Sequence, residues 1–308
     1  MRSIIVENCK KHDLSVTNYI LSKFPSLSKN FLFKALRNKD IKVNGKRISS
    51  NIVIQNRDNI DIYIDDVYLF NLPKKINYIY KDENIVVAFK PQGILSNYET
   101  GICNEPTFED LVKKDFKDAR ICHRLDRNTY GLLIFTLNEA AYEAILNGFK
   151  ENSIDKEYIA YVAYSKFAKQ NETLEKYILK DPKTGFSKIY DTNVKGSLNA
   201  TTIYNVISKN NKLDYAILKV KIPTGRTHQI RAQLKEINHP IIGDSKYGNN
   251  TINKKFNIYK QLLCAYKYTF SFKEDSYLSY LNNVIIELEK NIYSRNIGDV
   301  NNENRCRK

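Results

Sequence analysis

The sequence has few of the features that indicate a disulfide framework, a zinc site or a membrane span. Its five cysteines are odd in number and never form a CxxC pair, so we expect free thiols of a cytoplasmic protein rather than disulfides or a metal site. No apolar run approaches the roughly 20 residues of a membrane-spanning helix. Residues 1–7 are too short and too interrupted for a signal peptide, and we expect no membrane partner.

Acidic residues are also in deficit. Lys and Arg number 49 against 34 Asp and Glu, which gives a formal net charge of +15. This excess favours a polyanionic partner, of which nucleic acid is the commonest, although a solvated basic surface would have the same composition. At 308 residues, 42% of them hydrophobic, the chain is long enough for more than one domain and apolar enough for real cores.

The most informative stretch is 122–135, in which a dense polar cluster precedes a purely apolar run. Four apolar residues in a row, Leu132 to Phe135, predict a strand that is covered on both faces. Gly131 permits a tight entry to this strand. Asn138 after it is a good helix cap. The polar cluster therefore lies on a loop that feeds a rigid core strand, where a reactive side chain would be held in place.

Asp126 is the candidate reactive group on this loop. Arg124 and Arg127 bracket it, and two nearby guanidiniums would keep a carboxylate ionised at neutral pH. An ionised carboxylate in a basic field is a candidate nucleophile for an anionic substrate. A solvated ion-pair corner without catalytic function would have the same residue types, so the residues alone leave both interpretations open.

A second polar motif, Gly225–Arg231, follows the predicted strand 215–222. Thr224 or Thr227 can cap a helix that runs to about Lys235. Arg and His at a helix N-terminus, where backbone amides lack partners, make an anion site. A polar cap satisfied within the protein is the alternative.

The first 70 residues predict a small basic α+β unit. The patterns indicate helices from Asp13 to Lys23 and from Ser28 to Asn38, a hairpin around Asn44-Gly45 and a strand over 60–64. Residues 1–65 hold twelve Lys and Arg but six Asp and Glu. Basic helices and a basic hairpin suit RNA phosphates, whereas a solvated basic face is the alternative; the candidate RNA-binding residues are Lys29, Lys34, Arg37 and Lys46.

The rest of the chain gives coarser predictions. A linker over 71–77 leads to two strands, 78–80 and 85–89, with an acidic turn between them. A helix is expected over 108–116 and a strand over 155–162. Between 165 and 212 only a turn at 180–186 and a strand at 201–207 are indicated. The polar residues 291–308 are expected to be a disordered tail.

Three separated motifs resemble those of the RluA-type pseudouridine synthases, in the RluC/RluD-like branch. They are Lys-Pro-x-Gly at 90–93, His123-Arg124-Leu125-Asp126 with Thr129 and Gly131-Leu132-Leu133, and Gly-Arg-Thr-His-Gln-Ile-Arg at 225–231. The resemblance extends over residues 78–290. The N-terminal part is similar to the S-four RNA-binding domain through Ser28, Phe31, Ile41 and 43–46.

The resemblance implies an α+β fold, with a mixed, largely antiparallel sheet and flanking helices in the C-terminal part. It implies an isomerase that converts uridine to pseudouridine in RNA without metal or cofactor. Asp126 would be catalytic, by attack on the anomeric carbon or by starting elimination at the ribose. Arg231 would pair with Asp126, and Tyr158 would stack on the uracil. Arg124 would fill the space that the base vacates, while Arg226 and His228 would bind RNA.

Several points stay open at this stage. Large-subunit ribosomal RNA is the expected substrate and a monomer the expected state, but transfer RNA is an alternative, as is a catalytically silent RNA-binding protein that assists ribosome assembly. A glycoside hydrolase would need two carboxylates, and the central motif offers one.

Tyr130 replaces a residue that is usually small in the family, so we expect it to alter the shape of the site or access to it. Cys264 stands where His is frequent, and Cys122 is the thiol nearest the candidate site.

Overall fold

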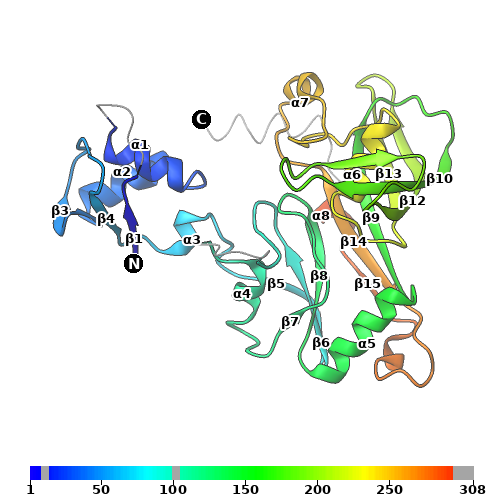
Figure 1. Ribbon diagram of the computed structural model, residues 1–308. Coiled ribbons are helices and arrows are strands. Elements are labelled where there is room, and N and C mark those ends of the chain that lie inside the picture. The colour runs from blue at the N-terminus through cyan, green and yellow to red at the C-terminus, as the bar shows by residue number, and fades with distance from the viewer. Residues whose placement is uncertain (8–13, 99–104, 294–308) are drawn as a thin grey trace. The chain divides into compact units, whose positions relative to one another are not determined.

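In the computed structural model, the described residues are 1–7, 14–98 and 105–293, and they form two compact units (Figure 1). Of these residues, 1–7, 14–75 and 105–106 belong to the N-terminal unit, and 76–98 and 107–293 belong to the C-terminal unit. Each unit has its own hydrophobic core.

The N-terminal unit contains an antiparallel four-stranded sheet with the strand order β1-β4-β2-β3. Its buried apolar residues, such as Ile20, Leu32 and Ile60, form the core of this unit. The predicted hairpin is confirmed, because Asn44 and Gly45 both have positive φ, 49° and 78°, as a two-residue turn of this kind requires. The elements are β1 (Arg2–Ile5), α1 (Val16–Lys23), α2 (Lys29–Arg37), β2 (Ile41–Val43), β3 (Lys46–Ile48), β4 (Asn59–Ile62) and α3 (Asp66–Leu69).

The helix caps of this unit differ in detail from the predicted ones. Helix α1 begins at Val16, and the Ser15 hydroxyl accepts a hydrogen bond from the Asn18 amide at 3.3 Å. The predicted cap, Asp13, lies outside the described residues. Ser28 occupies the N-cap of α2 as predicted, although its side chain makes no capping bond.

The C-terminal unit is built on an eleven-stranded sheet with the order β11-β10-β12-β13-β9-β14-β8-β6-β5, to which β15 adds beside β14 and β7 beside β8. Among the described strands only β14 and β8 pair in parallel, so the predicted mixed, largely antiparallel sheet is confirmed. The strands are β5 (Asn77–Lys81), β6 (Ile85–Lys90), β7 (Arg120–Ile121), β8 (Tyr130–Thr136), β9 (Ile154–Ala163), β10 (Asn171–Lys180), β11 (Ser187–Tyr190), β12 (Leu198–Asn210), β13 (Tyr215–Lys221), β14 (Leu263–Phe270) and β15 (Ile285–Glu287).

Strand β8 is the buried strand predicted from the apolar run. All seven of its residues are buried, and it lies between β6 and β14. Gly131 has φ of 121°, and a Cβ atom at this position would lie 2.1 Å from the Ala265 carbonyl oxygen. Only glycine therefore lets β14 approach β8 in the parallel register next to the Asp126 loop.

The helices of the C-terminal unit pack on different parts of the sheet. Helix α5 contacts β8 and β9, and α6 contacts β11 and β12. Asn138 caps α5 as predicted, because its side chain accepts from the Ala141 amide at 2.9 Å. The helices are α4 (Phe108–Val112), α5 (Glu139–Lys150), α6 (Gln229–Glu236), α7 (Asn250–Phe256), a 3₁₀ helix (Ser279–Leu281) and α8 (Lys290–Tyr293).

Three sequence predictions need correction here. Helix α4 ends at Val112 rather than at residue 116. Strands β10 and β11, which flank the correctly predicted turn at 180–186, were not predicted. Residues 290–293 form α8, and the Tyr293 ring packs on Tyr266 at 5.1 Å, so the start of the expected tail is ordered; residues 294–308 lie outside the described part.

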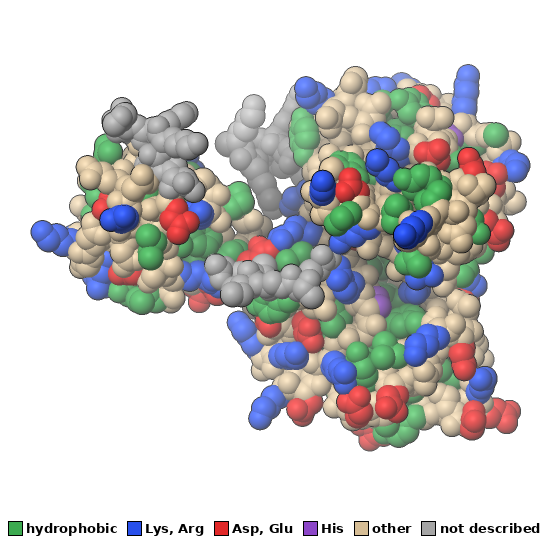
Figure 2. Space-filling model, viewed as in Figure 1, with side chains coloured by type: hydrophobic (Ala, Val, Ile, Leu, Met, Phe, Trp, Pro, Cys, Tyr) green, Lys and Arg blue, Asp and Glu red, His purple; other side chains and the backbone are tan. Residues whose placement is uncertain are grey.

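No helix in the described residues is both long enough and apolar enough to cross a membrane. Figure 2 shows Lys and Arg side chains interspersed with acidic ones over the visible face of the C-terminal unit, which is hollowed near its middle.

Candidate active site

The Asp126 loop connects β7 to β8, and almost every residue in it is fixed by a hydrogen bond. Ser96 Oγ donates to the Leu125 carbonyl at 2.7 Å and accepts from the Leu125 amide at 3.0 Å. The Gly93 amide donates to the Arg127 carbonyl at 2.8 Å. The Thr129 amide closes the turn on the Asp126 carbonyl at 3.0 Å. The loop is therefore a rigid platform.

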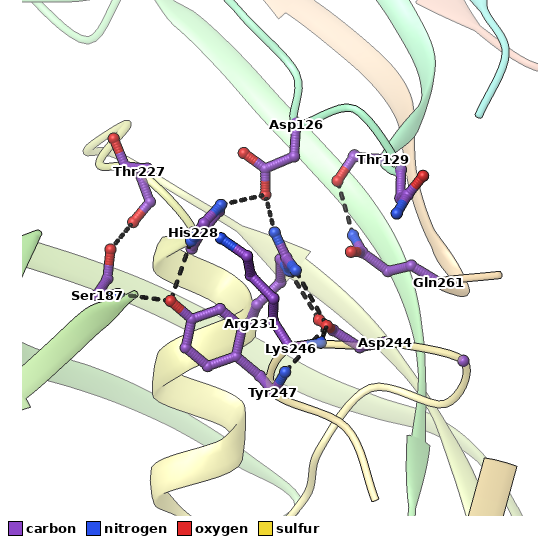
Figure 3. Close-up of polar contacts among 12 residues, drawn as sticks. Asp126, Thr129, Ser187, Thr227, His228, Arg231, Asp244, Lys246, Tyr247 and Gln261 are labelled. Carbon is purple, nitrogen blue, oxygen red and sulfur yellow. Dashed lines mark hydrogen bonds and ion pairs between the residues drawn. The ribbon is translucent and has the colours of Figure 1, made fainter. Parts of the chain in front are cut away.

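Two glutamines extend this network to other segments. Gln92 Nε2 donates to the Asn128 carbonyl at 3.1 Å and also to the Gln261 carbonyl. Gln261 Nε2 donates to Thr129 Oγ1 at 2.7 Å (Figure 3). Gln261 and Thr129 are both buried, so this polar contact is satisfied inside the protein.

Arg231, in the first turns of α6, connects two carboxylates (Figure 3). Its Nη1 donates to Asp126 Oδ2 at 2.7 Å. Its Nε and Nη2 donate to the two oxygens of Asp244 at 2.7 and 3.0 Å. The Asp126 side chain remains 25% exposed, whereas Arg231 is 6% and Asp244 0% exposed. The guanidinium is thus fixed from behind by Asp244 and directs one N–H group at Asp126.

Electrostatics support this arrangement. Burial on its own would lower the pKa of Arg231, but the hydrogen bonds and charges of Asp244 and Asp126 raise it. Burial opposes ionisation of Asp244, yet Arg231 and two backbone amides hold the pKa of Asp244 below its usual value. Those amides belong to Lys246 and Tyr247 and lie 2.8 and 3.0 Å from Asp244 Oδ1. Both members of the buried pair are therefore charged.

His228 stands at the N-cap of α6 in the left-handed conformation, with φ of 57°. The predicted caps are wrong: Thr224 Oγ1 donates to Gln229 Oε1 at 2.8 Å, and the Thr227 carbonyl accepts from Ser187 Oγ at 2.7 Å. The turn before the helix is closed by side chains, so neither threonine occupies the cap.

The left-handed turn places the His228 ring between Asp126 and Tyr247 (Figure 3). Nε2 lies 4.0 Å from Asp126 Oδ2, and Nδ1 lies 3.0 Å from the Tyr247 hydroxyl. That hydroxyl also accepts from the Ser187 amide at 2.6 Å, which fixes its position beside the ring. Burial lowers the pKa of His228 to about 4, although the Asp126 charge opposes the shift. The ring is therefore neutral at pH 7.

Tyr158 lies on β9, where it is 5% exposed and pairs with Ala265 of β14. Burial raises the pKa of its phenol, and the charge of Asp126 raises it further. The phenol is therefore protonated at neutral pH, and Asp126 is close enough for its charge to act on it. The structure thus pairs two of the predicted catalytic residues, Asp126 and Arg231, and it places the third, Tyr158, where the charge of Asp126 acts on its phenol.

Lys90, in the Lys-Pro-x-Gly motif, holds the Asp126 loop through hydrogen bonds to backbone carbonyls. Its Nζ donates to the carbonyls of Pro91, Ile94 and Arg127 at 3.1, 2.9 and 3.2 Å, and its side chain is fully buried. Burial lowers the pKa of Lys90 to about 7, and the charge of Asp126 partly offsets this effect. Three acceptors match the three donors of an ammonium group, so Lys90 is a support for the loop.

His123 and Cys122, which begin the central motif, are not reactive groups. His123 Nε2 accepts from the Ile134 amide at 3.3 Å and contacts the Tyr268 hydroxyl at 3.2 Å. Burial lowers the pKa of His123 to about 3. Burial also raises the pKa of the Cys122 thiol to about 12. The ring is neutral and the thiol protonated at pH 7, so both are structural.

The two departures from the family pattern are core residues. Tyr130 is 4% exposed and packs edge-on against Phe89 at 6.3 Å. The expectation that Tyr130 shapes the site is therefore not supported by its position, because its ring belongs to the hydrophobic core. Cys264 is fully buried in the same core.

The predicted RNA-binding residues lie in both units. Arg124 and Arg226 are exposed in the C-terminal unit, where Arg226 Nε donates to the Asn199 carbonyl at 3.0 Å. The others are exposed on α2 and β3 of the N-terminal unit; they are Lys29, Lys34, Arg37 and Lys46.

Sequence reasoning missed the residues that hold Arg231 and His228 in place. Asp244 and Tyr247 lie 13 and 16 residues beyond Arg231, in a loop. A loop has no helical or strand periodicity from which the direction of these side chains could be predicted. The stretch 239–248, in which Asp244 directly follows Ile241-Ile242 and Gly243, continues the resemblance to the family, but no role was predicted for Asp244 or Tyr247. Gly243 has φ of 79°, and a Cβ there would lie 2.1 Å from the Lys260 carbonyl oxygen.

The site offers one accessible carboxylate beside a protonated phenol and a neutral imidazole. Asp244, the second carboxylate, is fully buried and occupied by Arg231 and backbone amides, so it cannot activate a water molecule. This arrangement does not provide the acid and base pair of ordinary glycoside hydrolysis. In the described part of the chain, no group of three or more His, Cys, Asp or Glu side chains is placed to hold a metal ion.

Comparison with known proteins agrees with this chemistry. Residues 84–236 match the family described as RNA pseudouridylate synthase. The ribosomal large subunit pseudouridine synthase C of Rickettsia conorii is 33% identical, over 76% of this chain and 82% of that protein. The mitochondrial tRNA pseudouridine(32) synthase of Saccharomyces cerevisiae is 29% identical, over 79% of this chain and 53% of that protein.

A solved structure shares the fold. Human RNA pseudouridylate synthase domain containing 1 aligns with a TM-score of 0.54 and 20% identity, over 75% of this chain and 95% of that one. The family match spans both the Asp126 loop and Arg231. The chain belongs to the RluA-type RNA pseudouridylate synthases and is an RNA pseudouridine synthase.

Proposed function

We propose that this enzyme isomerises uridine in large-subunit ribosomal RNA and that Asp126 is its catalytic residue. The observation that best supports this proposal is the position of the Asp126 carboxylate. It is partly exposed and accepts a hydrogen bond of 2.7 Å from the Arg231 guanidinium, which Asp244 holds in place. A relative that acts on the ribosomal large subunit covers most of the chain. The basic excess of the sequence suits a phosphate-rich partner.

In this proposal the target uridine leaves its stack, because the glycosidic bond is inaccessible inside helical RNA. The bond from ring nitrogen 1 to the sugar breaks, the uracil turns, and carbon 5 bonds to the same sugar carbon. Carbon 5 loses its proton to solvent, and nitrogen 1 gains one. Asp126 acts either at the anomeric carbon or by removing a ribose proton, and both routes require the carboxylate form.

The neighbouring side chains have separate parts in this scheme. Arg231 orients the carboxylate through Nη1. Tyr158 stacks on the uracil, and its protonated phenol can donate to the base. The neutral ring of His228 lies with Nε2 4.0 Å from Asp126 Oδ2. Arg124 fills the gap that the base leaves, and the exposed Arg226 contacts the RNA backbone.

The N-terminal unit is proposed to be an S-four-type RNA-binding domain. The four predicted RNA-binding cations on α2 and β3 are exposed, form no ion pair within 4.0 Å with described acidic residues and are available to phosphates. They are Lys29, Lys34, Arg37 and Lys46.

The test is release of tritium from RNA labelled at uracil carbon 5, with ribosomal and transfer RNA from cells that lack the gene. The wild type should release tritium from ribosomal RNA, and Asp126→Asn should bind that RNA but release none. Release by Asp126→Asn at the wild-type rate would exclude the catalytic role of Asp126. Release from neither RNA pool would contradict the choice of substrate.

Transfer RNA is the second candidate substrate, because the yeast relative acts on it. Release from the transfer RNA pool alone would establish this alternative.

A further inference from the structure

Lys156, on β9 two residues before Tyr158, carries a charge that no acidic side chain in the described part of the chain balances by an ion pair. Residues two apart on a strand point to the same face, so Lys156 shares the face of Tyr158. Its side chain is half-buried. Nζ lies 4.5 Å from the centre of the Phe149 ring, and a Cβ at Gly225 would be 3.9 Å from it. Its ammonium thus lies between α5 and the loop that leads to His228.

The acidic residues next to Lys156 in the sequence lie on the opposite face of β9, where they form ion pairs with other lysines. Asp155 pairs with Lys221 at 2.7 Å, and Glu157 pairs with Lys219 at 2.7 Å. Lys156 forms no ion pair within 4.0 Å with a described residue. Burial alone lowers the pKa of Lys156 to about 8, without a carboxylate to oppose the shift. A desolvated cation without an anion is costly and is normally paired.

The neighbouring His123 supplies no negative charge to Lys156, because an imidazole is either neutral or cationic. Its ring is held neutral by the Ile134 amide, and it packs edge-on against Phe149 at 5.1 Å. Phe149 attracts the ammonium through its ring face, but this interaction is weak compared with an ion pair. The side of the ammonium toward Gly225 and the exposed Arg226 is therefore where an anion would bind.

We propose that Lys156 binds the phosphodiester that flanks the target uridine. Lys156 and Tyr158 are separated by about 7 Å along the strand, so a uridine whose base stacks on Tyr158 carries its backbone phosphate toward Lys156. The ion pair fixes the nucleotide while its base turns. This inference rests on the proposed function, since it places the uracil on Tyr158.

The first experiment measures RNA affinity as a function of salt concentration. The probe is a synthetic RNA hairpin that carries a uridine converted by the wild type, and all proteins carry Asp126→Asn to prevent turnover. Lys156→Met should weaken binding about tenfold and reduce the slope of log K against log salt by about 0.7–0.9. Lys156→Arg should keep the slope. Lys221→Met, which removes a paired lysine, is the matched control and should also keep it.

A second measurement identifies the phosphate. A single neutral methylphosphonate beside the uridine should weaken binding to Lys156-containing protein about tenfold but should cost Lys156→Met nothing further. If Lys156→Met keeps the full salt slope and still responds to the methylphosphonate, the proposal is wrong. In the enzyme that keeps Asp126, a loss of turnover caused by Lys156→Met, together with an unchanged salt slope in the Asp126→Asn background, would assign Lys156 to the base and would also overturn the proposal. If Lys156→Met does not fold, Lys156→Gln makes the same comparison.

An RNA-free measurement separates this proposal from the proposed function. Because no described acidic side chain forms an ion pair with Lys156, Lys156→Met should raise the melting temperature by about 2–4 °C, whereas Lys221→Met should not. A melting temperature lowered by Lys156→Met would show that the charge is balanced inside the protein and would contradict the inference, whichever RNA the enzyme modifies.

Discussion

Asp244 holds the guanidinium of Arg231 through two hydrogen bonds of 2.7 and 3.0 Å, while it is itself completely buried. The carboxylate that meets the substrate and the carboxylate that positions the arginine are thus different residues. This division of roles makes the contributions of the two aspartates to stability and to activity separable.

Asp244→Asn is expected to lower the free energy of unfolding by about 3–5 kcal/mol, because it removes the one fully buried carboxylate that pairs with the guanidinium of Arg231. Asp126→Asn should cost about 1 kcal/mol or less, since Asp126 is 25% exposed. Urea denaturation at pH 7 measures both. Equal losses in the free energy of unfolding would show that Asp126 and Asp244 stabilise Arg231 to the same extent.

Gly131→Ala should destabilise the enzyme by about 3 kcal/mol or more, because its Cβ would overlap the Ala265 carbonyl oxygen at a positive φ. Gly93→Ala is the matched control. Gly93 also has a positive φ, 91°, but nothing lies within 4 Å of its Cβ position, so the expected cost is about 1 kcal/mol. Urea denaturation measures both variants. A similar loss in the free energy of unfolding for the two would show that the close approach of β8 and β14 is not what makes Gly131→Ala destabilising.

Acidification should destabilise the enzyme between pH 6.5 and about 4. The pKa of His123 is about 3 and that of His228 about 4 in the folded state, against about 6.5 in the unfolded chain. The unfolded chain therefore binds more protons in this window, and stability is lost as the pH falls through it. The slope should reach about 1 kcal/mol per pH unit for each histidine.

The contribution of His123 is isolated by His123→Gln. This variant should lose less stability than the wild type on acidification from pH 6.5 to 4, as measured by urea denaturation. Parallel curves for the two proteins would mean that the pKa of His123 is not depressed.

Cys122 should resist alkylation in the folded enzyme. With its pKa raised to about 12, the thiolate is scarce at pH 8. Iodoacetamide at that pH should leave Cys122 unmodified in the native protein and modify it after unfolding in urea, as mass spectrometry would show. Rapid native modification, with activity lost in step, would instead indicate an exposed thiolate near the site.

The elements with strong local signals were predictable from the sequence. The run Leu132 to Phe135 predicted β8, Asn138 predicted the start of α5, and Asn44-Gly45 predicted the hairpin. Strand β10 was missed because its alternation is filled with Glu, Lys and Asn, which indicate a strand only weakly. It is held by pairing with β12 over eight residues, a long-range contact that no local pattern contains.

The same difference between local signals and long-range contacts applies to the candidate site. The residues of the motif suggested Asp126, but its pairing with Arg231 spans 105 positions and came from family resemblance alone. Asp244 and Tyr247 were missed because they act from a loop without periodicity. The left-handed cap at His228 was unexpected because the two threonines beside it are better cap formers, and the tertiary contacts with Ser187 and Gln229 overrode that preference.

The loop that carries Asp126 is tied to Gly93 and Ser96 after β6 and to Gln261 before β14. These anchors are separated by up to 132 residues from the loop positions they hold, so no fragment of the chain that lacks one of these strands contains the assembled site. Catalytic competence is consequently acquired only when the central strands have all docked. Turnover therefore reports complete assembly of the C-terminal unit, and a partly folded or proteolysed enzyme should be inactive well before its remaining secondary structure is lost.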